Sequence, residues 1–327
     1  MKKFSTSVAP LLSAALLLAL AGAAAAQQDY PNKPIRFITP FAPGGTTSVL
    51  ARLIGQKLTD SWGQPVLVDN RPGGNTVIGS EVLVKSPPDG YTIMLVANTH
   101  VINPLLIPNL PYDTVKDFAP VSTLTSSETV LVLHPSVPAN NLQELIALAK
   151  SKPGQLNYAT TGSGTVTHVE GELFNMMAGV KTQHVPYKGG APAITDLIGG
   201  QVQMTFNVPI ALVTHIKSGR LKAMAITGEA RFSALPQVPT FSEAGLPGFD
   251  LKWWYGVLAP AATPRAILDR LSTEIARILG VPDFKEKLDS QGMQAFISTP
   301  EQFAAMMKAE TAKYGRIIKT ANIKFEN

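Results

Sequence analysis

A short apolar strand, a glycine turn and a helix start follow one another twice in this chain, and this pattern constrains the fold most. In the first copy, residues 35–39 (Ile-Arg-Phe-Ile-Thr) predict a buried strand. Two prolines end that strand, and Gly44-Gly45 lets the backbone turn where a Cβ atom would clash. Residues 46–48 (Thr-Thr-Ser) can then cap a helix. The apolar face of that helix is Val49, Leu50, Leu53, Ile54 and Leu58.

The second copy lies about halfway along the chain. Residues 156–160 (Leu-Asn-Tyr-Ala-Thr) predict a strand, and residues 161–168 (Thr-Gly-Ser-Gly-Thr-Val-Thr-His) predict a glycine turn into a helix. Gly179 is placed to end that helix. Its predicted inward residues are Val166, Val169, Leu173, Phe174 and Met177.

A glycine turn that opens a helix directs several unpaired N–H groups at one point, where the helix dipole favours an anion. Neither turn contains the lysine of a phosphate-binding P-loop or matches Gly-x-Gly-x-x-Gly. We therefore interpret the turns as a site for an anion of carboxylate size. An ordinary strand-to-helix loop also explains either copy alone. Two copies in different halves of the chain favour a ligand held between two helix N-termini.

The first 26 residues predict a cleaved export signal. Met1-Lys-Lys is a positive start, residues 8–20 are apolar, and Ala24-Ala-Ala26 supplies small residues for a signal peptidase. The apolar run is short for a membrane anchor. The chain has no cysteine, which excludes a lipid-modified cysteine and a disulfide framework. We expect a soluble mature protein that begins at Gln27 and lies in the bacterial periplasm.

The charge pattern argues against a nucleic-acid partner. The chain has 28 Lys and Arg against 23 Asp and Glu, so loss of Lys2 and Lys3 with the signal leaves a net charge of +3. The basic residues are scattered and form no stripe. About 300 mature residues are enough for two cores, on the usual ~100–200 residues per domain.

Strands and helices alternate along most of the mature chain, which predicts two α/β units with parallel sheets. The further expected strands are residues 66–69, 91–97, 129–134, 182–187, 202–207, 221–227 and 251–259. The further expected helices include residues 82–84, 141–150, 191–198 and 210–217. Another is capped by Thr263, has Pro264 at its first position and is ended by Gly280 and Pro282. A last helix is opened by a capping box at Thr299. Residues 105–120 and 231–249 are expected to be irregular. Both glycine turns then lie at the carboxyl ends of strands, where open α/β sheets bind ligands.

Metal and hydrolase chemistry find little support in the motifs. His168 and Glu172 share a predicted helix face, but a metal site needs a third ligand and no paired-histidine motif exists. Ser163 lies in Gly-Ser-Gly, not in the Gly-x-Ser-x-Gly of a nucleophile elbow. A periplasmic hydrolase that acts through Ser163 is retained as an alternative. We expect no metal and no cofactor.

Seven motifs together resemble a known family, the periplasmic solute receptors of tripartite tricarboxylate transporters (TctC-like, or Bug, proteins). They are residues 41–47 (Phe-Ala-Pro-Gly-Gly-Thr-Thr), 70–74 (Asn-Arg-Pro-Gly-Gly), 87–91 (Pro-Pro-Asp-Gly-Tyr), 159–168, 185–189 (Val-Pro-Tyr-Lys-Gly), 239–245 (Pro-Thr-Phe-Ser-Glu-Ala-Gly) and 254–260 (Trp-Tyr-Gly-Val-Leu-Ala-Pro). The resemblance covers essentially the whole mature chain. It implies an α/β, two-lobed periplasmic binding protein, type II-like, with a ligand cleft between the lobes. Lobe 1 would be residues 27–127 plus 251–327, and lobe 2 residues 128–250.

The resemblance implies reversible binding of a small organic carboxylate, without a reaction, and its delivery to the membrane permease of such a transporter. The implied ligand-binding residues supply backbone N–H groups, hydroxyls and amides from the two glycine turns and nearby strand ends. They are Phe41, Pro43, Gly44, Gly45, Thr46, Thr47, Asn75, Asn98, Thr99, Thr161, Gly162, Ser163, Gly164, Thr165, Tyr187 and Asn207. Ser48 stands where relatives often carry Asp, which favours an anion over an amino acid.

Three points stay open at this stage. Phe41, Tyr187 and Trp254 can line the cleft or pack in the core, as aromatic residues commonly do. The loaded receptor can serve a sensor domain instead of a permease. The ligand can be a tricarboxylate, a C4 dicarboxylate, an aromatic carboxylate or a nicotinate-type acid.

Overall fold

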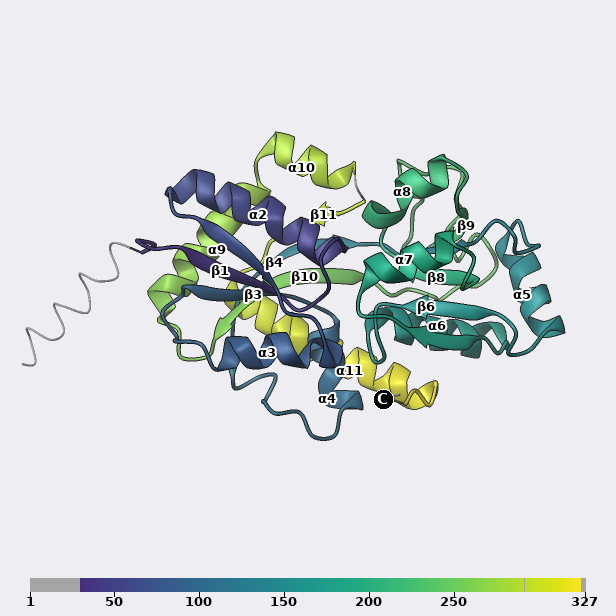
Figure 1. Ribbon diagram of the computed structural model, residues 1–327, viewed down its shortest axis with the longest axis horizontal. Coiled ribbons are helices and arrows are strands. Elements are labelled where there is room, and N and C mark those ends of the chain that lie inside the picture. The colour runs from purple at the N-terminus through teal and green to yellow at the C-terminus, as the bar shows by residue number, and fades with distance from the viewer. Residues whose placement is uncertain (1–29, 291, 325–327) are drawn as a thin grey trace, which may run out of the picture.

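The computed structural model describes residues 30–290 and 292–324, and its strands form two separate sheets (Figure 1). The six-stranded sheet has the order β11-β4-β10-β3-β1-β2, and the five-stranded sheet has the order β7-β6-β8-β5-β9. We call the parts of the molecule around these sheets lobe 1 and lobe 2. The expected pair of α/β units is therefore present, while the boundaries at residues 127/128 and 250/251 stay a prediction.

Lobe 1 is assembled from both ends of the chain. Its strands are β1 (Ile35–Thr39), β2 (Val66–Asn70), β3 (Thr92–Ala97), β4 (Phe118–Ser127), β10 (Trp253–Pro260) and β11 (Gln294–Ala295). Its helices are α2 (Thr46–Trp62), the 3₁₀ turn η1 (Gly74–Thr76), α3 (Val77–Val84), α4 (Thr99–Leu106), α9 (Arg265–Leu279), α10 (Pro282–Asp289) and α11 (Pro300–Thr320). In Figure 1, α2, α9 and α10 lie on one side of this sheet, and α3, α4 and α11 lie on the other.

Lobe 2 is built from the middle of the chain. Its strands are β5 (Val130–Leu133), β6 (Asn157–Thr160), β7 (Gln183–Pro186), β8 (Met204–Asn207) and β9 (Lys222–Ile226). Its helices are α5 (Leu142–Ser151), α6 (Val166–Ala178), α7 (Gly190–Ile198) and α8 (Pro209–Lys217). Helices α7 and α8 cover one face of its sheet and α6 the other (Figure 1).

Both sheets are mixed, so the expectation of purely parallel sheets is wrong. Strand β1 pairs in parallel with β2 and β3, but β10 runs antiparallel to both β3 and β4. In lobe 2, β6 is parallel to β7 and β8, whereas β5 is antiparallel to β8 and β9. The reversed strands β5 and β10 are the first strands after the chain passes from one lobe to the other. A strand that enters a sheet from the neighbouring lobe arrives from the carboxyl edge and must run backward.

The two lobes share part of one hydrophobic core. The larger apolar cluster includes Phe37 of lobe 1 together with Tyr158 and Phe206 of lobe 2, all fully buried. A second cluster, which includes Leu197 and Leu212, is confined to lobe 2 under α7 and α8. Helix α11 also leaves lobe 1 and contacts α6 of lobe 2. The lobes are therefore joined by packing on the α6–α11 side as well as by the chain itself.

Four helices and strands of lobe 1 were not predicted from the sequence: α4, α10, β4 and the two-residue strand β11. Residues 99–106 form α4 although Pro104 lies inside it, and α10 starts at Pro282, which was expected only to end the preceding helix. Strand β4 was missed because many of its buried residues carry hydroxyl groups. These are satisfied by hydrogen bonds to adjacent segments of the same chain, for example from Ser122 Oγ to the Ser298 carbonyl oxygen. The capping box of α11 is confirmed, but Pro264 is itself the N-cap of α9, and the Thr263 hydroxyl donates to Pro260 O. Val49 was expected to be buried and is exposed.

Within the described residues, no helix combines the length and the hydropathy needed to cross a membrane. The expected export signal, residues 1–26, lies outside the described residues.

Two helical glycines predict opposite effects of the same substitution. A Cβ atom at Gly171 in α6 would lie 2.1 Å from the Tyr158 ring, so Gly171→Ala should reduce the free energy of unfolding by about 1–3 kcal/mol through overpacking. At Gly315 in α11 the nearest atom is Leu105 Cδ2 at 3.8 Å, so Gly315→Ala should raise it by about 0.5–1 kcal/mol. Urea denaturation of both variants measures the change in the free energy of unfolding. If Gly171→Ala stabilises the protein as Gly315→Ala does, the close packing of α6 against Tyr158 is contradicted.

Candidate ligand-binding site

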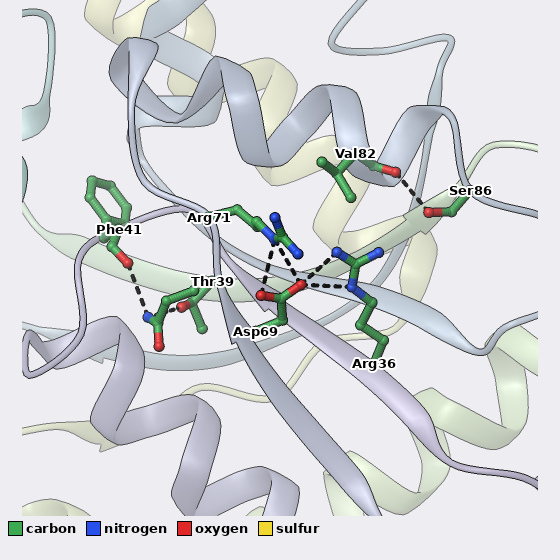
Figure 2. A network of polar contacts seen from close by, with 8 residues as sticks. Arg36, Thr39, Phe41, Asp69, Arg71, Val82 and Ser86 are labelled. Atoms are coloured by element: carbon green, nitrogen blue, oxygen red, sulfur yellow. Dashed lines mark hydrogen bonds and ion pairs between the residues drawn. The ribbon is translucent and has the colours of Figure 1, made fainter.

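Residues 40–45, called loop 1, connect β1 to α2 at the carboxyl edge of the six-stranded sheet. Asn70, at the end of β2, holds the start of this loop: its Nδ2 donates to Thr39 Oγ1 and, at 3.0 Å, to the Phe41 carbonyl oxygen. Figure 2 shows Thr39 and Phe41 in this network, with Arg36 and Arg71 converging on the Asp69 carboxylate beside it. Burial opposes ionisation of Asp69, but the hydrogen bonds from Arg71 and Arg36 outweigh it and lower the pKa of that carboxyl.

Helix α2 begins without a side-chain cap. Its N-cap is Gly45 in an extended conformation, not one of residues 46–48 as the sequence suggested. The N–H groups of a first helical turn have no intrahelical acceptor, and a glycine N-cap supplies none. The first turn of α2 therefore presents unpaired backbone N–H groups to the space in front of the helix start.

Residues 161–165, called loop 2, use most of their donors internally. Thr161 N donates to Thr167 Oγ1 at 2.9 Å, and Gly164 N donates to His168 Nδ1 at 3.1 Å. Thr165 N donates to the Gly162 carbonyl at 3.2 Å. Gly162 N donates to Thr160 Oγ1 at 3.3 Å. The N–H groups of Gly162, Gly164 and Thr165 therefore already have acceptors within the protein, and a ligand contact by this loop stays a prediction.

The helix start that faces loop 1 from lobe 2 is that of α7, which sequence reasoning did not assign. Gly189 is its N-cap, at a φ of 129°, and a Cβ atom there would lie 3.4 Å from Ala42 N. A Cβ atom on Gly45 would lie 3.9 Å from Gly190 N. Glycines thus let the two backbones approach across the boundary between the lobes. The pair Gly189-Gly190 before an expected helix was the signal that could have identified this second start.

A small cavity lies between these two helix starts. It has a volume of about 30 Å³ and is lined by Phe41, Gly45, Thr46, Thr47, Ala97, Thr99, Thr161, Gly190, Asn207, Trp253 and Tyr255. We call it the inner cavity. None of these lining residues carries a charged side chain, and the first turns of α2 and α7 contain no acidic residue. Donors without a fixed negative charge favour an anionic group here.

Two larger cavities adjoin the inner cavity and share lining residues with it. The outer cavity, about 450 Å³, shares Phe41 and Thr161 with the inner cavity. It is also lined by Pro40, Gly73, Gly74, Asn75, Thr76, Val77, Ile107, Gly162, Ser163, Tyr187 and Lys188. A side cavity of about 250 Å³ lies along α7 and shares four residues with the inner cavity: Gly45, Thr46, Gly190 and Asn207. The boundary between the lobes is thus hollowed on both sides of the inner cavity.

Comparison with known proteins decides the family. Residues 50–323 match the family model described as tripartite tricarboxylate transporter family receptor. The chain belongs to this family. Over 315 residues it is 36% identical to Protein BugT of Bordetella pertussis, and the match covers 95% of this chain and 97% of that protein. The resemblance seen in the sequence is confirmed.

Solved structures agree with the family and with the two-lobed fold. The periplasmic binding protein BugD has a TM-score of 0.86 at 30% identity, covering 91% of this chain and 100% of that one. R. palustris Rpa4515, solved with adipate, has a TM-score of 0.88 at 34% identity, covering 90% and 99%. MatC from Rhodopseudomonas palustris, with bound malate, has a TM-score of 0.84 at 30% identity, covering 88% and 100%. The chain is a periplasmic solute-binding receptor of this family.

Most residues expected to bind ligand lie around the three cavities of this receptor. The inner cavity takes Phe41, Gly45, Thr46, Thr47, Thr99, Thr161 and Asn207, the outer cavity adds Asn75, Gly162, Ser163 and Tyr187, and Gly44 lines the side cavity. Pro43, Asn98, Gly164 and Thr165 line none of them. Which of these residues contact a ligand stays a prediction.

Asn98 has a structural role in the receptor instead. It is fully buried, and its Nδ2 donates to Lys252 O and to the Tyr314 hydroxyl. Its Oδ1 accepts from Trp254 N at 3.0 Å, so every polar atom of the side chain is used. Trp254 packs edge-on against Phe303 in the core of lobe 1, and its neighbour Trp253 lines the inner cavity. Successive side chains of a strand point to opposite faces of the sheet, so Trp253 points to the cavity and Trp254 to the core.

His168 supports loop 2 and does not form a metal site with Glu172. Its ring stacks on His184 at 4.0 Å between centroids, and the Glu172 carboxylate accepts a hydrogen bond from Tyr158. Among residues 30–290 and 292–324, no three His, Cys, Asp or Glu side chains are grouped closely enough to hold a metal ion. Burial, followed by the charge of His184, lowers the pKa of His168 to about 3. The ring is therefore neutral at physiological pH, with Nδ1 free to accept the Gly164 N–H.

This lowered pKa predicts acid sensitivity. A histidine that is neutral in the folded state and titrates normally when unfolded stabilises the fold above its ordinary pKa of about 6.5 and loses that contribution as pH falls. Between pH 6.5 and pH 4.5 the loss should be about 2–3 kcal/mol. His168→Asn retains an acceptor for Gly164 and cannot titrate, so its free energy of unfolding should fall less over this range. Urea denaturation at several pH values compares the two, and identical pH slopes would refute the role of His168.

Proposed function

We propose that this protein is a transport receptor that reversibly binds a small organic carboxylate between its lobes and presents it to the membrane permease of a tripartite tricarboxylate transporter. The observation that carries the proposal is the inner cavity, where the uncapped starts of α2 and α7 face each other among hydroxyl and amide side chains with no charged residue. We further propose that residues 1–26 direct export to the periplasm and that the protein catalyses no reaction.

Neutral donors are sufficient for such a ligand. A hydrogen bond to a charged group contributes about 1.5–3 kcal/mol, and a micromolar Kd corresponds to about 8 kcal/mol after the costs of association. The first turn of α2, the Gly190 N–H, Asn207 Nδ2 and the hydroxyls of Thr46 and Thr161 are enough donors on this scale. An arginine clamp is not required.

The sizes of the cavities suggest how a ligand is arranged. The inner cavity, at about 30 Å³, is large enough for only a small chemical group. The outer cavity, at about 450 Å³, lies in the usual range for small-molecule sites. We infer that the carboxylate enters between α2 and α7 while the body of the ligand occupies the outer cavity, where Phe41, Val77 and Ile107 supply apolar wall. Entry then requires the lobes to separate.

The proposed partners follow from the family. Relatives with solved structures hold adipate or malate, and the family model describes receptors of tripartite tricarboxylate transporters. We therefore propose a di- or tricarboxylate or an aromatic carboxylate as ligand, and integral-membrane permease subunits as the partner of the loaded receptor.

A thermal-shift screen tests the ligand class. Ligand-free protein is mixed with a panel of small carboxylates and, as controls, with their neutral amides. A ligand at one hundred times its Kd should add about 2.7 kcal/mol to the stability of the folded state and raise Tm. We expect at least one acid, and not its amide, to do so, with the acid recovered unchanged afterwards. Conversion of the acid into a product would contradict a receptor role.

Asn207→Asp tests the anion site within the inner cavity. Asn207 Oδ1 accepts from Val208 N at 2.9 Å, and Nδ2 lies 3.3 Å from where a Cβ atom on Gly190 would stand. Aspartate keeps the first bond but replaces the amide donor with a negative charge, so the affinity for the carboxylate should fall about 10–100-fold. Asn140→Asp makes the same change at an exposed position before α5, and its affinity should stay unchanged. Calorimetric titration of both variants gives the comparison, and equal affinities would argue against an anion beside α7.

A further inference from the structure

Tyr255 lines the inner cavity and carries a hydroxyl group that no described residue satisfies. The residue is fully buried on β10 and lines the cavity. Its Oη has no hydrogen-bond partner among the described residues. Tyr255 lies in the motif at residues 254–260, but it was not among the residues expected to bind ligand.

Strand pairing explains why Tyr255 reaches the cavity. Because β10 is antiparallel to β3, its first residues lie beside the carboxyl end of β3, and Tyr255 pairs with Ala97, another lining residue. Burial raises the pKa of the Tyr255 hydroxyl far above its usual range, and the nearby Thr46 side chain offsets part of that rise without completing a hydrogen bond. Thr46 belongs to the first turn of α2, so the hydroxyl lies beside the proposed anion position.

Glu170 lies directly behind this wall of the cavity. It belongs to α6 and is fully buried. Its Oε1 accepts hydrogen bonds from Thr129 Oγ1 at 2.7 Å and from Trp253 Nε1 at 3.3 Å, and Trp253 lines the inner cavity. Oε2 has no hydrogen-bond partner among the described residues. The side chain thus joins the start of β5, the start of β10 and α6 at the place where the chain crosses between lobes.

We propose that the Tyr255 hydroxyl donates a hydrogen bond to the ligand carboxylate in the inner cavity, and that Glu170 positions Trp253 behind it as an uncharged carboxylic acid. This inference rests on the proposed function and adds two residues to its site. An unpaired buried hydroxyl costs free energy in the empty receptor. The unpaired hydroxyl of Tyr255 is explained if it donates a hydrogen bond to the ligand when the ligand is present. Residues kept for binding commonly lower the stability of the free protein in this way.

A neutral Glu170 is required by the electrostatics of the site. Neither of its hydrogen-bond partners, Thr129 and Trp253, is a cation. The titratable groups that interact electrostatically with Glu170 are Tyr255 on β10 and Tyr314 on α11. Glu310 of α11 also interacts with Tyr314. Burial therefore raises the pKa of Glu170 to about 8, against smaller opposing effects of the Thr129 and Trp253 hydrogen bonds. With Oε1 accepting two bonds, the proton resides on Oε2. An ionised Glu170 would repel an anion in the adjoining cavity.

The test compares Tyr255→Phe with a matched control, Tyr112→Phe. Tyr112 also has a buried hydroxyl without a hydrogen-bond partner among the described residues, but it packs against Phe118 in lobe 1 and lines none of the three cavities. With the best acid from the panel as probe, calorimetry should show affinity reduced about 10–100-fold in Tyr255→Phe. Tyr112→Phe should bind like the natural protein. Both variants should melt at or above the Tm of the natural protein without ligand, because each removes an unpaired buried hydroxyl.

Glu170→Gln tests the second half of the proposal. Above the pKa of Glu170, each pH unit should weaken binding of a fully ionised acid about tenfold in the natural protein, so its Kd at pH 9 should be about ten times that at pH 7. Glutamine retains an acceptor for Thr129 and Trp253 and cannot ionise, so the Kd of Glu170→Gln should change little over this range. A variant with the same slope as the natural protein overturns the role of Glu170.

The outcomes separate this inference from the proposed function. If the natural protein binds no carboxylate, the proposed function fails and the inference fails with it. If the natural protein binds and Tyr255→Phe binds equally well, only the inference is overturned. An equal loss in Tyr112→Phe also overturns it, because the effect would then be general to buried hydroxyls.

Discussion

A carboxylate that leaves water needs hydrogen-bond donors that are already in place, and at the site we propose the main chain supplies them instead of cations. Backbone donors are unpaired only where a helix starts, so the site depends on two uncapped helix starts that face each other. Gly45 and Gly189 are the N-caps of α2 and α7, and neither offers a side chain that could compete with a ligand. The Asn70 amide, tied to Thr39 and Phe41, holds loop 1 so that the first of these helices points at the cleft.

This arrangement requires that the surrounding core carry no negative charge. Donors without positive charge favour an anion only if no negative charge lies nearby. Among the described residues, Glu170 is the fully buried carboxyl near the cavity, and its burial favours the protonated form. The same side chain spans the crossing between lobes through Thr129 and Trp253. The continuous apolar cluster that joins the lobes on the α6–α11 side lowers the local polarity there. Packing between lobes and the charge state of the site therefore depend on each other.

Local patterns predicted much of the fold. Apolar runs located β1, β2, β3, β5 and β8, and the capping box located the start of α11. Patterns failed where a residue had two local interpretations. Proline begins helices as well as ending them, which concealed α10. The hydroxyl-rich β4 is buried because the carbonyl groups of Ser298 and Phe296, from the far end of the chain, accept hydrogen bonds from its side chains. The hydrogen-bond partners that make such a strand possible cannot be read from the strand itself.

The sequence by itself determined the family, the two glycine turns and the absence of a phosphate or metal motif, and most of the residues that it marked as ligand contacts line a cavity. Only the tertiary structure decided which helix of lobe 2 faces loop 1 and which aromatic residues reach the site. Loop 2 already donates two of its N–H groups to Thr167 and His168 of α6, whereas the start of α7 approaches Ala42 through glycines that lie far from it in sequence. Trp253 and Tyr255 line the inner cavity while Trp254 lies in the core, because the pairing of β10 with β3 sets which face of the strand points to the cleft. Strand pairing and donor satisfaction are non-local, and a sequence pattern records neither.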